Sequence, residues 1–237
     1  MKKAILLSAS LFSFLFLSAQ SLVGAWEMVT PDESGREIKI SLVVSDKYQV
    51  ATWYDNKTGE FIATNGGTWS LDNKTMTETV EFDTRDSTRV GASVSFDIEL
   101  SDTELKVVDS DLSLTRTDAG KPGALSGAWL MSGRIRNGEM QPRNTDRPRK
   151  TMKILSGTRF QWIAYNTETK RFMGTGGGSY STIDGKYTEN IEFFSRDDSR
   201  VGAALEFKYE MKDGKWHHSG NNSRGEPLYE VWSVREK

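Results

Sequence analysis

The stretch from Thr77 to Phe96 reads TETVEFDTRDSTRVGASVSF, and the stretch from Thr188 to Phe207 reads TENIEFFSRDDSRVGAALEF. The second lies 111 positions after the first, and 11 of the 20 aligned residues are identical. A segment from Phe61 to Trp69 matches Phe172 to Tyr180 at the same shift. The repeated unit is about 100 residues long, which exceeds the period of solenoid repeats and is the size of a small domain. The repeat therefore predicts two domains of one kind.

The two copies begin with similar segments, LVGAWEM at 22–28 and LSGAWLM at 125–131. The shift between these segments is only 103, so the second copy carries inserted residues in its first part. Between the copies, the segment DAGKPG at 118–123 is rich in residues that interrupt regular structure. We expect domains at 22–116 and 125–237, joined by a linker at 117–124.

Apolar and polar residues alternate from Val90 to Leu100, and again from Val201 to Met211. This period of two is typical of strands with one face in a core. We expect eight strands per copy and no helix. In the first copy the expected strands lie near 22–29, 36–44, 47–54, 60–70, 75–82, 90–100, 103–108 and 111–116.

The lengths of the turns favour a barrel. Short turns such as Asp72-Asn73 and Asp184-Gly185 follow the second, fourth and sixth expected strands, and generally longer loops follow the others. Alternate turns of antiparallel neighbours lie at opposite ends, so we expect a closed floor and a looped mouth. The glycines at 66–67 and 176–178, inside strands, suit the sharp bends of a barrel. The prediction is an all-β fold of two tandem antiparallel up-and-down β-barrels.

The Gly-Ala-Trp sequences ending at Trp26 and Trp129 resemble the Gly-x-Trp signature of the lipocalins. In that family an Arg or Lys late in the barrel packs over the Trp at the closed end, and the resemblance assigns these structural roles to Arg116 and Arg235. The short units, without cysteine or a C-terminal helix, look closest to the small lipocalin-like domains of secreted bacterial proteins. The resemblance implies that the protein carries a ligand, without identifying it.

The chain begins with Met1-Lys2-Lys3, followed by an apolar run over 4–17 and then Ser18-Ala19. This order is typical of a secretory signal peptide, which we expect at 1–19, and the run is shorter than the roughly 20 residues that a membrane-spanning helix needs. We therefore expect a secreted or periplasmic protein with no membrane span. The absence of cysteine excludes disulfides and thiolate metal sites.

The net charge of −2 argues against nucleic acid as a partner. Residues 22–116 carry 9 Lys and Arg against 18 Asp and Glu, a balance of −9, whereas residues 125–237 carry 19 against 14, a balance of +5. We expect the two domains to attract each other at low salt. The sequence leaves the oligomeric state open.

Glu78 and Glu189 each lie on the same face of their expected strand as apolar neighbours two positions away. This predicts that both carboxylates point into the barrels. Such a group is costly to bury unless it is paired or hydrogen-bonded. It is either a structural element of the core, as we expect for Glu78, or a polar anchor in a ligand cavity, as we expect for Glu189. On the second hypothesis, Glu189→Gln weakens binding with little change in stability.

The second copy has the more basic mouth, so we place the ligand there. The candidate binding residues are a buried carboxylate, aromatic side chains near it and arginines around the mouth: Glu189, Tyr187, Phe160, Trp162, Tyr165, Arg134, Arg136, Arg196, Arg200 and Arg224. Their repetition in both copies favours interpretation of the Arg-Asp-x-x-Arg loops, which contain Arg196 and Arg200, as structural turns. The alternative is that the arginines bind an anionic headgroup bidentately.

His217 and His218 are the only histidines, and consecutive strand residues face opposite ways, so we predict no metal site and no cofactor. No nucleophile motif is present. The leading hypothesis is a secreted, non-enzymatic protein whose second barrel binds a small hydrophobic, amphipathic or anionic ligand. The alternatives are a structural or envelope-interaction module with filled cores, and an enzyme that uses Glu189 as an acid or base.

Overall fold

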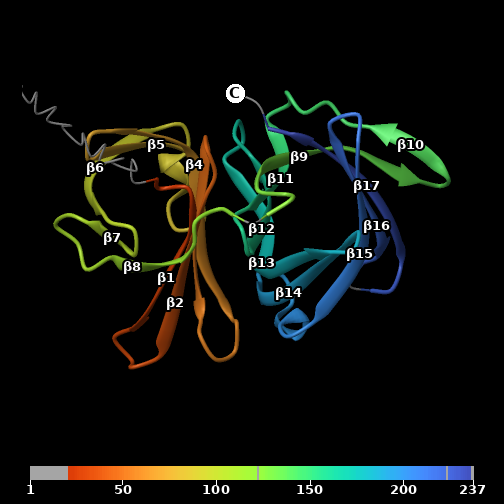
Figure 1. The fold of residues 1–237 in the computed structure, drawn as a ribbon. Helices are drawn as coiled ribbons and strands as arrows, with labels where there is room; N and C mark the ends of the chain where they lie inside the picture. Colours follow the sequence, from red (N-terminus) through yellow and green to blue (C-terminus); the bar gives the residue numbers. More distant parts are fainter. Residues whose placement is uncertain (1–20, 122, 223, 236–237) are drawn as a thin grey trace, which may run out of the picture.

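The computed structural model describes residues 21–121, 123–222 and 224–235, so the expected signal peptide lies outside the described residues. The predicted fold class is confirmed: the chain is all-β and forms two closed antiparallel barrels in tandem (Figure 1). Within the described part, no helix has the length and hydrophobicity needed to cross a membrane.

The first barrel is a simple up-and-down meander. Each strand pairs with the next along the chain, and the last pairs with the first to close the barrel. Its strands are β1 (Gly24–Pro31), β2 (Glu37–Val44), β3 (Tyr48–Asp55), β4 (Phe61–Asp72), β5 (Thr75–Asp83), β6 (Ser93–Leu100), β7 (Glu104–Val107) and β8 (Ser113–Asp118).

The second barrel repeats this order with one addition. The strand β10, formed by the residues inserted in this copy, pairs only with β9 as an outlying hairpin, and the other eight strands close through β9 and β17. The strands are β9 (Gly127–Arg136), β10 (Glu139–Pro142), β11 (Arg149–Leu155), β12 (Arg159–Asn166), β13 (Arg171–Ile183), β14 (Lys186–Phe194), β15 (Ala204–Lys212), β16 (Lys215–Asn221) and β17 (Pro227–Val234).

The glycines inside β4 and β13 mark bulges, as barrel curvature requires. The pairing register shifts between Gly66 and Gly67 in the first barrel and between Gly177 and Gly178 in the second. A Cβ atom added to Gly67 would lie 1.9 Å from the carbonyl oxygen of Thr79. Only a residue without a side chain allows the strands to approach so closely.

The repeated Arg-Asp-x-x-Arg loops form short 3₁₀ helices, η1 (Ser87–Arg89) and η2 (Asp198–Arg200). Asp86 and Asp197 cap them by accepting hydrogen bonds from the backbone N–H groups two residues later. This geometry corresponds to the structural-turn interpretation of the motif.

At the closed end of the first barrel, the Arg116 guanidinium lies 3.9 Å from the centre of the Trp26 ring. Trp26 and Trp129 both donate from Nε1 to a carbonyl four residues earlier, at 2.9 Å. The expectation for Arg235 is corrected, because Arg235 lies 4.0 Å over the ring of Tyr48 in the first barrel instead of over Trp129. In β17 the even-numbered residues from Leu228 to Trp232 face the cavity, so alternation turns position 235 outward.

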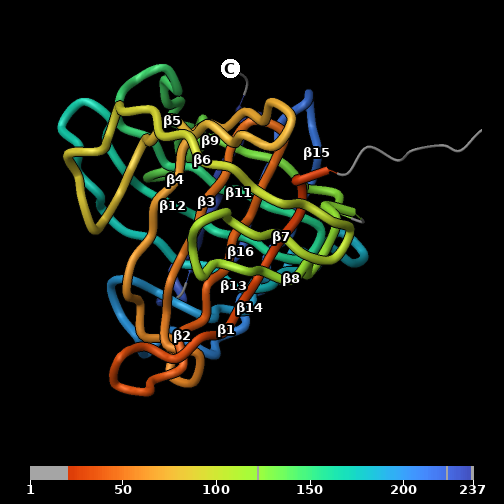
Figure 2. Tube along the Cα trace, turned by 90° about the vertical axis from the view of Figure 1, so that its left-hand side faces the viewer, coloured from red at the N-terminus to blue at the C-terminus, as the bar shows by residue number. Residues whose placement is uncertain are grey.

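The two barrels pack side by side through the outer faces of β2, β3 and β5 and of β11, β12 and β13 (Figures 1 and 2). A single buried hydrophobic cluster includes Val50 and Phe82 from the first barrel and Ile154 and Ile163 from the second. The barrels therefore touch, as expected, through buried apolar surface. Specific ion pairs also cross the contact: Arg159 with Glu27, Lys39 with Glu192 and Arg235 with Glu81.

The contact is nearly symmetric. Phe61 stacks on its own repeat counterpart, Phe172, with ring centres 5.9 Å apart. Tyr54 donates a hydrogen bond to Glu192 at 2.9 Å, and the counterpart pair, Tyr165 and Glu81, does the same at 2.5 Å. Equivalent surfaces of the two copies thus face each other, as in an isologous dimer.

Candidate functional site: two barrel cavities

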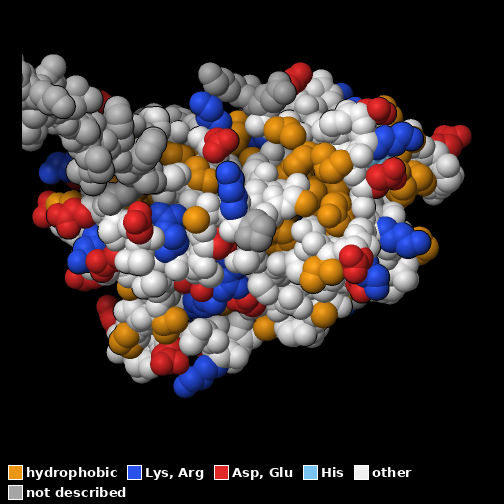
Figure 3. Space-filling model, viewed as in Figure 1, with side chains coloured by type: hydrophobic (Ala, Val, Ile, Leu, Met, Phe, Trp, Pro, Cys, Tyr) orange, Lys and Arg blue, Asp and Glu red, His pale blue; other side chains and the backbone are white. Residues whose placement is uncertain are grey.

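The second barrel encloses a cavity of about 280 Å³ between β9 and β11 to β17. Its wall is mainly apolar, and hydrophobic side chains are visible within the ring of strands of this barrel (Figure 3). Polar side chains converge on it from several strands and from the loops at its mouth. The lining consists of Met131, Thr151, Lys153, Trp162, Glu189, Ile191, Phe194, Arg200, Ala203, Leu205, Phe207, His218, Asn222, Leu228, Glu230 and Trp232.

A buried ion pair crosses the interior of this barrel. The Lys153 ammonium on β11 lies 2.6 Å from Glu189 Oε1 on β14, and both side chains are 6% exposed. The same ammonium lies within 5.2 Å of the ring centres of Tyr187, Trp216 and Trp232, where cation–π attraction adds to the ion pair. Glu189 therefore points inward as predicted, and its partner is a lysine.

His218 and Glu230 extend this polar group. His218 Nδ1 lies 3.4 Å from Lys153 Nζ, while His218 Nε2 is buried with no hydrogen-bond partner among the described residues. Burial, together with the neighbouring ammonium, lowers the pKa of His218 well below its ordinary value. Burial raises the pKa of Glu230, which accepts a hydrogen bond from Trp232 Nε1 at 3.2 Å. The cavity thus offers hydrogen-bonding groups deep inside an apolar wall.

Of the predicted binding residues, Trp162, Glu189 and Arg200 line this cavity. Phe160 and Tyr187 lie in the hydrophobic core of the same barrel, with their rings edge to face at 6.3 Å. These two aromatic residues support the cavity from behind its lining.

Tyr165 does not belong to the cavity. It lies on the outer face of β12, packs against Phe82 of the first barrel at a ring distance of 4.8 Å, and donates to Glu81. Trp162 and Tyr165 have opposite parity on this strand, so the alternation of side chains sends Tyr165 to the interface between the barrels.

The structure brings only part of the predicted ring of arginines to the cavity. Arg134 and Arg136 are exposed on the part of β9 that continues into the β10 hairpin, outside the cavity lining. Arg134 is the cross-strand partner of Glu230, which lines the cavity, and its charge acts to lower the pKa of that carboxyl. Arg196 donates to the carbonyl of Met173, and Arg224 pairs with Glu226 at 3.2 Å. Among the five predicted arginines, the cavity lining includes Arg200.

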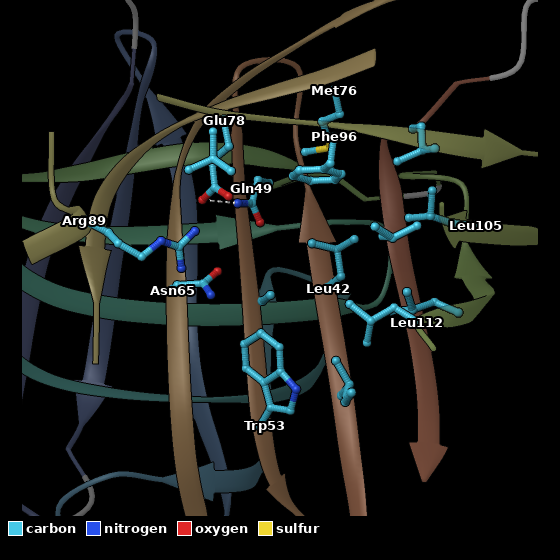
Figure 4. Close-up of a pocket in the computed structure, with 16 residues that line it drawn as sticks. Leu42, Gln49, Trp53, Asn65, Met76, Glu78, Arg89, Phe96, Leu105 and Leu112 are labelled. Carbon is cyan, nitrogen blue, oxygen red and sulfur yellow. Dashed lines mark hydrogen bonds between the residues drawn. The ribbon is translucent and has the colours of Figure 1, made fainter. Parts of the chain in front are cut away.

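The first barrel contains a larger cavity, of about 330 Å³, which the sequence did not predict. Glu78, Gln49, Asn65 and Arg89 gather at one side of it, and the rest of the wall is apolar (Figure 4). Gln49 Nε2 donates a hydrogen bond to Glu78 Oε1 at 2.6 Å. Burial raises the pKa of Glu78, although Arg89 and the Gln49 hydrogen bond act in the opposite direction.

Sequence reasoning missed Lys153, His218 and Glu230. The repeat itself contains a signal for two of them: at the shift of 111, Lys153 aligns with Leu42 and His218 aligns with Val107. Burying a charged or ionisable side chain is costly, so its presence where the other copy has an aliphatic residue indicates that the interiors of the two barrels differ in function.

Comparison with known families gives a match over residues 124–233 to a domain of unknown function, DUF4488. The matched segment covers the second barrel from the start of β9 to Ser233 in β17. No curated protein matches the chain.

Proposed function

We propose that the chain is a secreted, non-catalytic, lipocalin-like binding protein whose second barrel holds a small amphipathic or anionic molecule. The observation that carries the proposal is the cavity of about 280 Å³ with its few buried polar groups. Small-molecule sites are typically concave and apolar, with a small number of polar groups that orient the ligand. The size of this cavity favours a small ligand.

The polar groups of the cavity support a ligand with both apolar and polar parts. Trp162, Phe194 and Leu205 offer apolar contact, while buried His218 Nε2 has no hydrogen-bond partner among the described residues and offers a polar group to a ligand. Arg200, whose Nε pairs with Asp197 at 3.1 Å, contributes its guanidinium to the lining, where it is suited to contact an acidic group.

Two observations favour this function over the alternatives. A purely structural module needs no hollow core, yet both barrels enclose cavities. An acid–base enzyme needs an available carboxylate, whereas Glu189 is held by Lys153 at 2.6 Å.

Native mass spectrometry of the full chain, purified from its own host, tests the proposal. We expect a bound small molecule on the wild type and its loss from Leu205→Trp, which fills the cavity from β15. Lys208→Trp, on the exposed face of the same strand, is the matched control and should retain the molecule. A wild-type protein with no bound molecule, or retention by Leu205→Trp, would contradict the proposal.

A further inference from the structure

Glu78 in the first barrel is a carboxylate whose hydrogen-bonded partner is a neutral amide. Gln49 occupies its Oε1 atom, and no side chain of the described residues forms a hydrogen bond or ion pair with its Oε2 atom. The nearby Arg89 guanidinium is already paired with Asp83 at 2.7 Å. Asp83, Arg89 and ionised Glu78 together leave one negative charge without compensation at this side of the cavity.

The second barrel shows what compensates the same carboxylate there. Glu189 is the repeat counterpart of Glu78, and the Lys153 ammonium neutralises it. At the shift of 111, Leu42 stands in the place of Lys153, so the first barrel lacks this ammonium and has cavity beside Leu42.

The side chains that pack around the Lys153 ammonium are also replaced by smaller ones in the first copy. Tyr187 and Trp216, which pack against Lys153, align with Met76 and Leu105 in the first copy. Both smaller side chains line the first cavity, which is the larger of the two. The first barrel therefore has room, an apolar wall and an unneutralised carboxylate where the second has its own lysine side chain (Figure 4).

We propose that the first barrel is a second binding site, which takes an amphiphile with a primary ammonium head. The head lies against Glu78 and Gln49, where it replaces the charge that Lys153 supplies in the second barrel. The apolar tail lies along Leu42, Phe96 and Leu112. The excess of acidic residues in the first copy attracts such a cation.

Calorimetric titration of the full chain with decylamine, decanol and decanoate tests this site, because the three probes share a tail length and differ in head charge. We expect decylamine to bind at least about tenfold more tightly than decanol, a difference of about 1.4 kcal/mol, and decanoate to bind most weakly. Equal binding of the three probes, preference for decanoate or no binding of decylamine would overturn the proposal.

Variants then locate the site. Glu78→Gln should lower the affinity for decylamine to that for decanol. Decanol should still bind this variant, which shows that the barrel is folded. Leu42→Lys should abolish decylamine binding, because it introduces the ammonium found in the second barrel. Glu37→Gln, which removes an exposed carboxylate from the same strand as Leu42, should leave the preference intact.

The second barrel provides the remaining control. Leu205→Trp, which fills the other cavity, should leave decylamine binding unchanged. Loss of decylamine binding in Leu205→Trp, or an unchanged preference in Glu78→Gln, would place the amine elsewhere and overturn the proposal.

Discussion

Lys153 and Glu189 form a charge pair that is almost completely removed from water, so each depends on the other. We expect Glu189→Gln to lower the free energy of unfolding by about 3–5 kcal/mol, because it leaves a buried ammonium unpaired. This differs from the sequence-based expectation of little change in stability. Adding Lys153→Met should recover most of the loss, since an apolar side chain needs no charged partner. Urea unfolding of the two single variants and the double variant measures this, and a double variant as unstable as Glu189→Gln would contradict it.

His218 predicts a dependence of stability on pH. Its pKa in the folded chain lies well below the ordinary 6.5, so below that pH the unfolded chain binds a proton that the folded chain does not. Stability should therefore fall as the pH drops from neutral to about 5.5, with a contribution of up to about 1.4 kcal/mol per pH unit from this residue.

Urea unfolding across this pH range checks the contribution of His218. The variants are compared by the slope of the free energy of unfolding against pH. Glu78 and Glu230 have raised pKa values and contribute slopes of the opposite sign to that of His218. His218→Gln should lose the histidine contribution, whereas His217→Gln, at the partly exposed neighbouring position, should keep it. Equal slopes in the two variants would contradict the assignment.

At the scale of the strands, the glycine bulges determine how sharply each barrel closes. We expect Gly67→Ala to cost about 1–3 kcal/mol, because the new Cβ atom meets the backbone of β5 at 1.9 Å and the strands must separate. Gly91→Ala is the comparison, since its Cβ atom meets nothing within 4 Å and only the positive φ of 90° opposes it. Thermal unfolding should rank Gly67→Ala as the less stable variant.

The strand pattern was the part of the fold most accessible from sequence. Alternation from Val90 to Leu100 predicted a strand, and the structure places β6 within that range. The hairpin of β9 and β10 was not predicted, because its burial pattern is exposed on both faces and so has no periodicity to detect. The arginines at 134 and 136 were consequently assigned to a mouth loop.

At the scale of the whole molecule, the two barrels share one buried cluster and a symmetric set of polar contacts. We expect small-angle scattering to give the same compact dimensions at low and high salt, because apolar burial is not screened. We also expect a single cooperative transition in urea when both barrels are monitored. An increase in the radius of gyration at high salt would indicate that net charge holds the barrels together.

The sequence by itself determined the repeat, the strands, the barrel closure and the inward direction of Glu78 and Glu189. These follow from periodicity and turn chemistry, which are local properties of the chain. The tertiary structure alone decided which residue meets each carboxylate and which outer faces join the barrels. Lys153 and Glu189 are 36 residues apart and meet across a barrel interior, and Tyr54 meets Glu192 across the interface. Alternation assigns a side chain to a face, but the neighbour across that face depends on how the closed barrels curve and dock.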